Sequence, residues 1–414
     1  MVAARHRARS NLTQAYTPHV IRTPTALLLS NGHGEDVIAV RLARALARER
    51  PDLDIRAFPT VGMGSAFTDA PVTLLDPRQT LPSGGLTMTS PRLLQRDLRA
   101  GLLALTLQQF HVLRRERPDF VLTVGDAWLE ALGLLPRAKR RYAVQTLVSV
   151  HLANRERTPG IMALRERITW VERTILTRGY QSVYVRDPAT RDALAPFHPR
   201  VRALGTPMMD DLDASPLPLD TPGPRILLLP GSRANATDVL AVMRAALQEL
   251  ESRYAPLDAV VAWAGPSVPG APEGWTVQAS PVAEVVWQRG GIRLHVTVDR
   301  FAAALAWADV VLGVSGTAVE QAAGRGRPIV SFEAPPFYDA RFLARQARLL
   351  DGALEIVPND ATAISAALRS LIENPDLRRQ RGERGRERMG PSGAAQRIAR
   401  DVLHDAGLLA GGAS

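Results

Sequence analysis

The sequence predicts an α/β protein made of two doubly wound, mainly parallel sheets that face each other across a central cleft. Short apolar runs of strand length alternate with helical patterns along the whole chain, as in parallel sheets covered by helices. The 414 residues exceed what one hydrophobic core usually supports, so two domains of about 200 residues each are expected. A segment rich in proline, residues 214–224, separates the two halves.

The expected elements follow this division. In the first half, strands are predicted at 26–29, 120–124 and 182–186, a Gly-containing loop at 31–34 and an amphipathic helix at 98–114. In the second half, the predicted strands are 225–229, 258–262, 309–312 and 329–332. The expected segments are a disordered basic tail (1–22), a first domain (23–213), a linker (214–224), a second domain (225–392) and a C-terminal helix (393–414) that either stays with the second domain or crosses back to the first.

The composition excludes several kinds of site. No cysteine is present, which excludes disulfides, thiolate nucleophiles and cysteine-ligated zinc. The histidines never fall at metal-ligand spacing and no carboxylates cluster as in a metal cage, so no metal site is expected. The net charge of +10 comes almost entirely from arginine, since Lys139 is the only lysine. It indicates either a generally basic surface or attraction to an anionic membrane or to nucleotide phosphates.

Two loops of the second half have the character of a phosphate site. Gly231, Ser232 and Arg233 follow a predicted strand and offer close backbone approach, a hydroxyl and a forked donor. Ser315, Gly316 and Thr317 also follow a strand, and they open a helix whose amides and dipole favour an anion. One turn later, Glu320 is placed to accept hydrogen bonds from a ribose diol. The alternatives are an ordinary turn with a solvated arginine, and a glutamate that merely favours the helix N-terminus.

These residues, with further motifs, resemble lipid-A-disaccharide synthase and its related proteins, which have the GT-B fold of two Rossmann-like domains. The resemblance rests on 228–233, 315–320, 324–330 and 393–399, and extends more loosely over 26–405, with Thr206 where that family has histidine. It implies an inverting, metal-independent glycosyltransferase that moves a sugar from a UDP-sugar to a lipid acceptor. No cofactor is then expected, because the UDP-sugar is a substrate. Arg233 and the loop at 315–317 would hold the diphosphate, and Glu320 the ribose.

The first loop of the chain is a candidate lining for the cleft on the acceptor side. It follows the first strand and contains Asn31, Gly32, His33, Gly34, Glu35 and Asp36. A dinucleotide site is not favoured, because Val37 stands where the third glycine of G-x-G-x-x-G belongs and Arg56 where an acidic residue would end the second strand. The alternative is that Glu35 and Asp36 only favour the N-terminus of the following helix.

Asp126, at the carboxyl end of a predicted strand, is the candidate general base. An inverting transfer needs one group to remove the proton from the acceptor hydroxyl, and a carboxylate in the cleft suffices. Asp126 matches by position the first aspartate of the synthase's Asp-Ala-Pro-Asp-Phe motif, but Trp128 and Leu129 replace the proline and the second aspartate of that motif, which indicates a different acceptor. The alternative is an N-cap for the helix that follows. His33 is the second candidate for the base.

Residues 84–105 combine leucines with Arg92, Arg96 and Arg99, which suits the surface of an anionic membrane or a helix packed on the sheet. No apolar run of about 18 residues occurs and no signal-like apolar region follows the N-terminus, so a cytoplasmic protein is expected, with peripheral contact at the inner face of the membrane as an alternative. The rival functions are a UDP-GlcNAc 2-epimerase-like enzyme and a non-catalytic nucleotide-sugar-binding protein. Nucleic acid is not expected as a partner, and the sequence predicts no oligomeric state.

Overall fold

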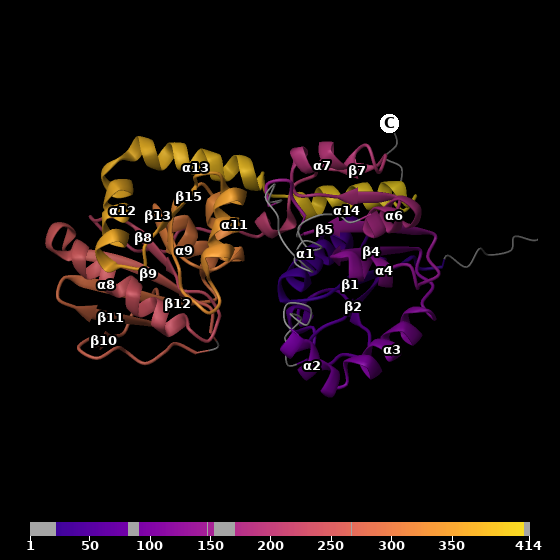
Figure 1. The fold of residues 1–414 in the computed structure, drawn as a ribbon, viewed down its shortest axis with the longest axis horizontal. Helices are drawn as coiled ribbons and strands as arrows, with labels where there is room; N and C mark the ends of the chain where they lie inside the picture. The colour runs from indigo at the N-terminus through magenta and orange to yellow at the C-terminus, as the bar shows by residue number, and fades with distance from the viewer. Residues whose placement is uncertain (1–21, 82–90, 147, 153–169, 266, 410–414) are drawn as a thin grey trace, which may run out of the picture.

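The protein has two α/β lobes that lie side by side (Figure 1). The computed structural model describes residues 22–81, 91–146, 148–152, 170–265 and 267–409, and the side chains of residue 33 and residues 91–94 lie outside this description. The first lobe contains a 7-stranded sheet and the second an 8-stranded sheet.

The first sheet is parallel throughout, with the order β3-β2-β1-β4-β5-β6-β7. Its central strands are buried along their whole length, as expected for apolar strands covered by helices on both faces. The strands are β1 (Thr25–Ser30), β2 (Asp54–Pro59), β3 (Thr73–Leu74), β4 (Phe120–Gly125), β5 (Arg140–Gln145), β6 (Ser182–Tyr184) and β7 (Val201–Arg202). The helices are α1 (His33–Glu49), α2 (Pro91–Arg99), α3 (Leu102–Leu113), α4 (Ala127–Leu132), α6 (Trp170–Gly179) and α7 (Pro188–Leu194), with the short 3-10 turns η1 (Ser65–Phe67) and η3 (Pro207–Met209).

The second sheet has the order β10-β11-β12-β9-β8-β13-β14-β15, and β10 and β11 run antiparallel at one edge. Its strands are β8 (Ile226–Leu229), β9 (Leu257–Trp263), β10 (Thr276–Gln278), β11 (Val285–Arg289), β12 (Ile292–Val298), β13 (Val310–Gly313), β14 (Ile329–Phe332) and β15 (Leu354–Val357). The helices are α8 (Ala236–Tyr254), α9 (Phe301–Trp307), α10 (Thr317–Gly324), α11 (Ala340–Leu350), α12 (Ala361–Glu373) and α13 (Pro375–Met389). In both sheets the strand order reverses next to the first strand, at β1/β4 and at β8/β13.

The chain returns to the first lobe at its end. After α13, helix α14 (Ala394–Asp405) packs against α1 (Figure 1). Asp210 accepts hydrogen bonds from the amides of residues 393–395 and so caps α14. The hydroxyls of Tyr142 and Tyr184, from the first sheet, donate to Asp405 and Asp401 on α14. The first lobe is thus built from chain segments on both sides of residues 214–224.

Residues 214–224 form no helix or strand and lie against the second lobe. The amide of Leu217 donates to the carbonyl of Ala303, and Trp307 Nε1 donates to the carbonyl of Leu219 at 3.1 Å. Two predictions of local structure were wrong. The helix predicted at 98–114 is broken into α2 and α3, because Gly101 adopts a left-handed φ of 96°. The loop predicted at 31–34 is shorter, because α1 already begins at His33.

Candidate functional site

The loop after β8 meets the loop after β14 at the carboxyl edge of the second sheet. Gly231 has a φ of 91°, and a Cβ on it would lie 2.2 Å from the Tyr338 hydroxyl, so only glycine fits there. Ser232 and Arg233 are exposed beyond this turn, and the Arg233 guanidinium lies 5.9 Å from the Phe337 ring centroid. Burial raises the pKa of Tyr338, which keeps its hydroxyl neutral beside Arg233. The loop therefore presents a cation and small polar groups on a rigid turn.

The first turn of α10 lies at the next strand of the same edge, because β13 pairs with β8 at Gly313 and Leu229. Its N-cap is Gly316, which has no side chain, so the amides that begin at Thr317 receive no hydrogen bond from the side chain of the N-cap residue. The Ser315 Oγ is buried and has no hydrogen-bond partner in the part of the chain that the structure describes. A buried hydroxyl without a partner is costly and marks a place where a ligand atom can bind. This loop and Arg233 therefore flank one switch point of the sheet.

Glu320, the candidate residue for binding the ribose, is buried, and its carboxylate already accepts hydrogen bonds from two side chains. Its Oε2 accepts a hydrogen bond of 2.7 Å from Arg186 Nη2, which comes from the first lobe. Its Oε1 accepts from Gln346 Nε2 at 3.2 Å. The carboxylate is therefore fixed in direction by two donors, and a ribose diol would add to this arrangement or replace part of it.

In the first sheet, the corresponding switch point brings the loops after β1 and β4 together. A Cβ on Gly125, whose φ is 155°, would lie 2.6 Å from Asn31 Oδ1, so the Asn31 side chain lies directly against the Gly125 backbone. Gly32 is the N-cap of α1 and Gly34 is exposed in its first turn. Glu35 is half-buried and folds back, its Oε2 3.0 Å from where a Cβ on Gly32 would stand. The structure therefore brings Asn31 to the edge beside Asp126, while the His33 side chain lies outside the described residues.

Asp36 is held by the last residue of β1 at this edge, and its role in lining the cleft stays a prediction. Its side chain is buried, and Ser30 Oγ donates a hydrogen bond of 2.5 Å to Asp36 Oδ1. The reason is helical geometry: α1 begins at His33, so residue 36 already points into the lobe. Asp36 joins the end of β1 to the start of α1.

Asp126 is the N-cap of α4, which was one of the two roles considered for it. Its Oδ1 accepts from the amides of Trp128 and Leu129 at 3.1 and 3.4 Å. The cap uses only Oδ1, and the half-buried side chain stands at the carboxyl end of β4. Trp128 is 48% exposed and packs against the Phe110 ring of α3. Capping and proton transfer are compatible, because the second oxygen is not used for the cap.

Beneath Asp126 lies a buried pair of carboxyl groups that the sequence did not reveal. Gln145 Nε2 donates to Glu130 and, at 3.1 Å, to Glu172 Oε1. The pKa of Glu130 is raised well above its usual value, first by burial and then by the charge of Glu172. Glu130 Oε2 and Gln145 Oε1 are both buried without a partner among the described residues. A proton on Glu130 would supply the donor that this cluster lacks.

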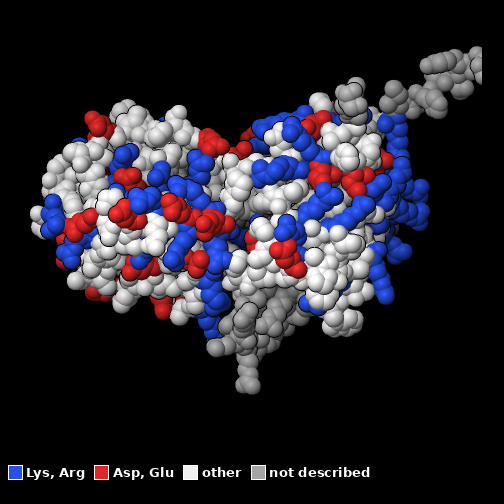
Figure 2. All heavy atoms as spheres, turned by 90° about the horizontal axis from the view of Figure 1, so that it is seen from above, with Lys and Arg blue, Asp and Glu red and all other residues white. Residues whose placement is uncertain are grey.

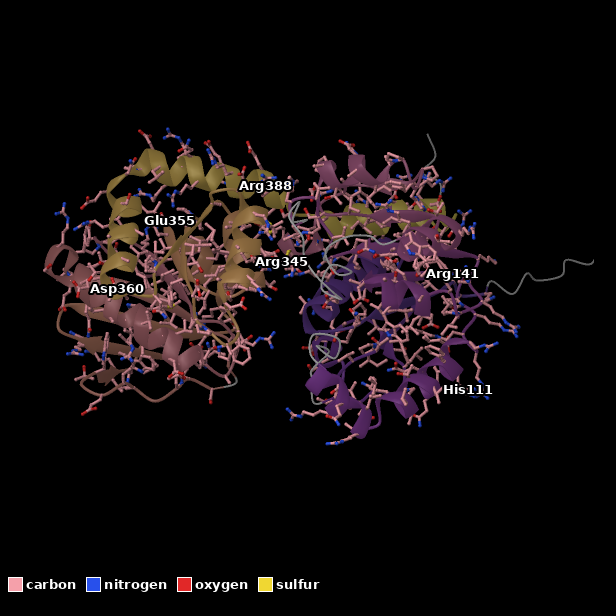
Figure 3. All side chains as sticks on the ribbon, in the orientation of Figure 1. His111, Arg141, Arg345, Glu355, Asp360 and Arg388 are labelled. Atoms are coloured by element: carbon pink, nitrogen blue, oxygen red, sulfur yellow. The ribbon has the colours of Figure 1, made fainter. Side chains whose placement is uncertain are left out.

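Arg186 and His151 are the other residues that sequence reasoning missed. Both follow strands of the first sheet, and both contact the second lobe: Arg186 pairs with Glu320, and His151 lies against Arg388 at the end of α13. Burial and then the Arg388 charge lower the pKa of His151. Figure 3 shows Arg388 and Arg345 on the side of the second lobe that faces the first. The signal was available, because the carboxyl end of a parallel strand is where ligands bind in open α/β sheets.

The surface charge is mixed. On the face shown in Figure 2, arginines and acidic side chains are interspersed over both lobes. Within the described residues, the helices include none that is both long enough and apolar enough to cross a membrane. On α3, however, Leu103 and Leu107 are 65% and 68% exposed, one helical turn apart. Arg96 and Arg99 are exposed on the neighbouring α2.

Neither a protein-family model nor a curated protein sequence matches this chain. Solved structures match it over nearly its whole length. The glycotransferase of kitacinnamycin has a TM-score of 0.60 and 16% identity, covering 93% of this chain and 99% of that chain. The glycosyltransferase SnogD from Streptomyces nogalater has a TM-score of 0.54 and 17% identity, covering 93% and 100%. UDP-GlcNAc 2-epimerase from Neisseria meningitidis, bound to UDP-GlcNAc, has a TM-score of 0.54 and 14% identity, covering 92% and 100%.

At these identities the likeness establishes the fold and not the activity. Two Rossmann-like lobes, each with its switch point at the carboxyl edge of a parallel or mainly parallel sheet, match these structures along both chains. The predicted fold class is confirmed, and the finer resemblance to lipid-A-disaccharide synthase stays a prediction. The chain has the GT-B fold.

Proposed function

We propose that this protein is an inverting, metal-independent glycosyltransferase that moves a sugar from a UDP-sugar to a lipid or lipid-linked acceptor. The observation that carries the proposal is the second switch point. There Ser315 Oγ, which is buried and has no partner among the described residues, and the first turn of α10, whose N-cap is Gly316, stand beside exposed Arg233. Amides, a hydroxyl and a guanidinium are the groups that bind a diphosphate.

The chemistry assigns one role to each lobe. The acceptor hydroxyl oxygen attacks the anomeric carbon from the face opposite UDP, and its proton passes to Asp126. The bond between the anomeric carbon and the UDP oxygen breaks, and its electron pair stays on the diphosphate. Arg233 and the amides of α10 stabilise that developing charge without reorganising, which is the work a divalent ion would otherwise do.

A lipid acceptor and peripheral membrane contact are supported by the exposed apolar residues of the first lobe. Leu103 and Leu107 on α3 are exposed near arginines of α2, and Trp128 packs beside α3 at the edge that holds Asp126. Apolar side chains among cations suit an anionic bilayer. Replacing both leucines with serine should weaken sedimentation with anionic vesicles several-fold, while UDP binding stays unchanged.

The second candidate is an enzyme that epimerises a UDP-sugar. This candidate is favoured because an epimerase, the Neisseria meningitidis UDP-GlcNAc 2-epimerase bound to UDP-GlcNAc, has the same fold as this chain. An epimerase needs no acceptor, whereas a transferase does. A third candidate, a protein that binds a nucleotide-sugar without acting on it, shares the donor site and would give no product.

The test is a donor screen. The purified chain is incubated with UDP-sugars, in EDTA, with and without total membrane lipid extract, and the products are read by mass spectrometry. We expect a new glycolipid and free UDP only when lipid is present. An epimeric UDP-sugar formed without lipid would replace the proposal by the second candidate, and UDP binding with no product by the third.

A further inference from the structure

One buried ion pair joins the two lobes at the candidate donor site. Arg186 Nη2 lies 2.7 Å from Glu320 Oε2, and the two side chains are only 8% and 11% exposed. Arg186 comes two residues after the end of β6 in the first lobe, and Glu320 lies in the first turn of α10 in the second. Nearby, Gln321 Nε2 donates to the Met208 carbonyl, so this is a packed contact rather than a single touching pair.

Besides Glu320, Arg186 has neighbours from both lobes. Its Nη1 donates to the Thr146 carbonyl, which follows β5, at 3.3 Å, and its Nη2 also lies 3.8 Å from the Met208 sulfur and 3.7 Å from the Met389 sulfur. These neighbours are neutral, so Glu320 is the only carboxylate recorded as an ion-pair partner of Arg186 among the described residues.

A ribose could bind Glu320 in two ways, by displacing Arg186 or by adding to the intact ion pair, and the burial of Arg186 favours the second. A ribose that displaced Arg186 from Glu320 would leave a buried guanidinium unpaired, which costs far more than one hydrogen bond returns. A ribose that joins the existing arrangement costs less. Among the described residues, each oxygen of the Glu320 carboxylate accepts one hydrogen bond, and each has capacity for another.

We propose that Arg186 is a donor-positioning residue supplied by the first lobe. Together with Gln346, it fixes the direction of the Glu320 carboxylate, so that the carboxylate accepts hydrogen bonds from the hydroxyls of the donor ribose. Recognition of the ribose in the second lobe then depends on contact with the first. This inference rests on the proposed function, since it concerns the same nucleotide-sugar site.

The test compares UDP with 2′-deoxy-UDP by isothermal titration. The ratio of their two dissociation constants isolates ribose recognition, because any loss of folded protein affects both ligands equally. We expect the wild-type chain to bind UDP about tenfold more tightly than 2′-deoxy-UDP, because the deoxy ligand lacks one charge-assisted hydrogen bond to the carboxylate. In R186A the ratio should fall towards one, and in R186K it should be intermediate. If R186A does not fold, R186K carries the test.

Arg41 provides a matched control. It is also a largely buried arginine that ties separate segments together, donating to the Pro207 carbonyl and pairing with Asp211 at 3.3 Å. R41A should reduce stability and leave the ratio unchanged. In the double variant R186A/E320A, the ratio should equal that of E320A alone, because Arg186 acts through Glu320.

The outcomes separate this inference from the proposed function. An R186A protein that keeps the wild-type ratio, or that binds UDP more tightly than wild type, overturns the positioning role and leaves the donor site standing. A wild-type chain that binds UDP without discriminating against the 2′-deoxy ligand does the same. A wild-type chain that does not bind UDP overturns both.

Discussion

The two switch points of this molecule have the same topology and use their polar groups in opposite ways. At β1/β4, the Asp36 carboxylate accepts a hydrogen bond from Ser30, Asp126 caps α4, and Asn31 packs on Gly125. At β8/β13, Ser315 Oγ has no partner among the described residues, and Arg233 is exposed. The Asp36 and Asp126 carboxylates of the first switch point are hydrogen-bonded within their lobe, whereas the Ser315 hydroxyl and Arg233 of the second can bind a ligand. The comparison teaches that a run of polar residues does not by itself identify an anion site. Polar groups that make no hydrogen bond within the described part of the protein are what distinguish such a site from a structural turn.

The largest effect should come from D126N. Asparagine caps a helix about as well as aspartate, so α4 should persist while the proton acceptor is lost. Turnover should fall by about 10²–10⁴-fold, with UDP affinity unchanged. Steady-state kinetics and titration with UDP measure both quantities. Unchanged turnover would reduce Asp126 to a cap and make the first switch point purely structural.

R233A should weaken UDP binding by roughly 10- to 100-fold, because it removes a charge-assisted contact to the diphosphate. Arg253 is the matched control, an exposed arginine of the same lobe that pairs with Glu373. R253A should leave UDP affinity as it is. Equal affinities in R233A and R253A would remove Arg233 from the site.

S315A sharpens the comparison further, since it deletes only the unpartnered hydroxyl. UDP affinity should fall about three- to tenfold, the value of one hydrogen bond. Stability without ligand should hold or rise slightly, because a buried orphan group is removed. Ser331 Oγ is also without a partner among the described residues, but Ser331 is buried within strand β14, so S331A should be neutral towards UDP. A similar affinity loss in both variants would mean that packing, and not the ligand, explains S315A.

The smallest effect concerns the first lobe. Because burial and Glu172 raise the pKa of Glu130, the folded state binds its proton more tightly than the unfolded state does. The stability that this group contributes is complete below the unfolded pKa, near 4.5, and is lost as the pH rises through the folded pKa.

E130Q removes this titration while keeping the shape. Its melting temperature relative to wild type should therefore increase as the pH rises from 5 to 8, by roughly 1 °C for each kcal/mol of strain relieved in a chain of this length. Thermal unfolding at several pH values measures it. A difference that stays constant with pH would show that Glu130 does not titrate in this range.

Much of the fold was open to prediction from the sequence because it depends on periodicity. Apolar strands at Ala26 and Phe120 and the proline-rich segment at 214–224 each give a local signal. The antiparallel edge strands β10 and β11 gave none, since both strands are short and partly exposed. The break at Gly101 depends on one backbone angle, which composition cannot fix.

The sequence predicted the site residues that lie together in one loop, and it did not predict contacts between loops that are distant along the chain. Ser315 and Arg233 follow apolar strands, so their place at the sheet edge follows from the pattern. The burial of Asp36, the pairing of Glu320 with Arg186 and the Glu130 cluster depend on residues separated along the chain. Those contacts are products of the tertiary fold, and a single sequence holds no periodicity for them.

The most direct test of the account is a crystal structure of the chain soaked with UDP in the presence of EDTA. We predict diphosphate density between Arg233 and the first turn of α10, within hydrogen-bond distance of Ser315 and Thr317, and the ribose beside Glu320. Density at the loops after β1 and β4 instead, or diphosphate binding only when a divalent ion is supplied, would contradict the central claim.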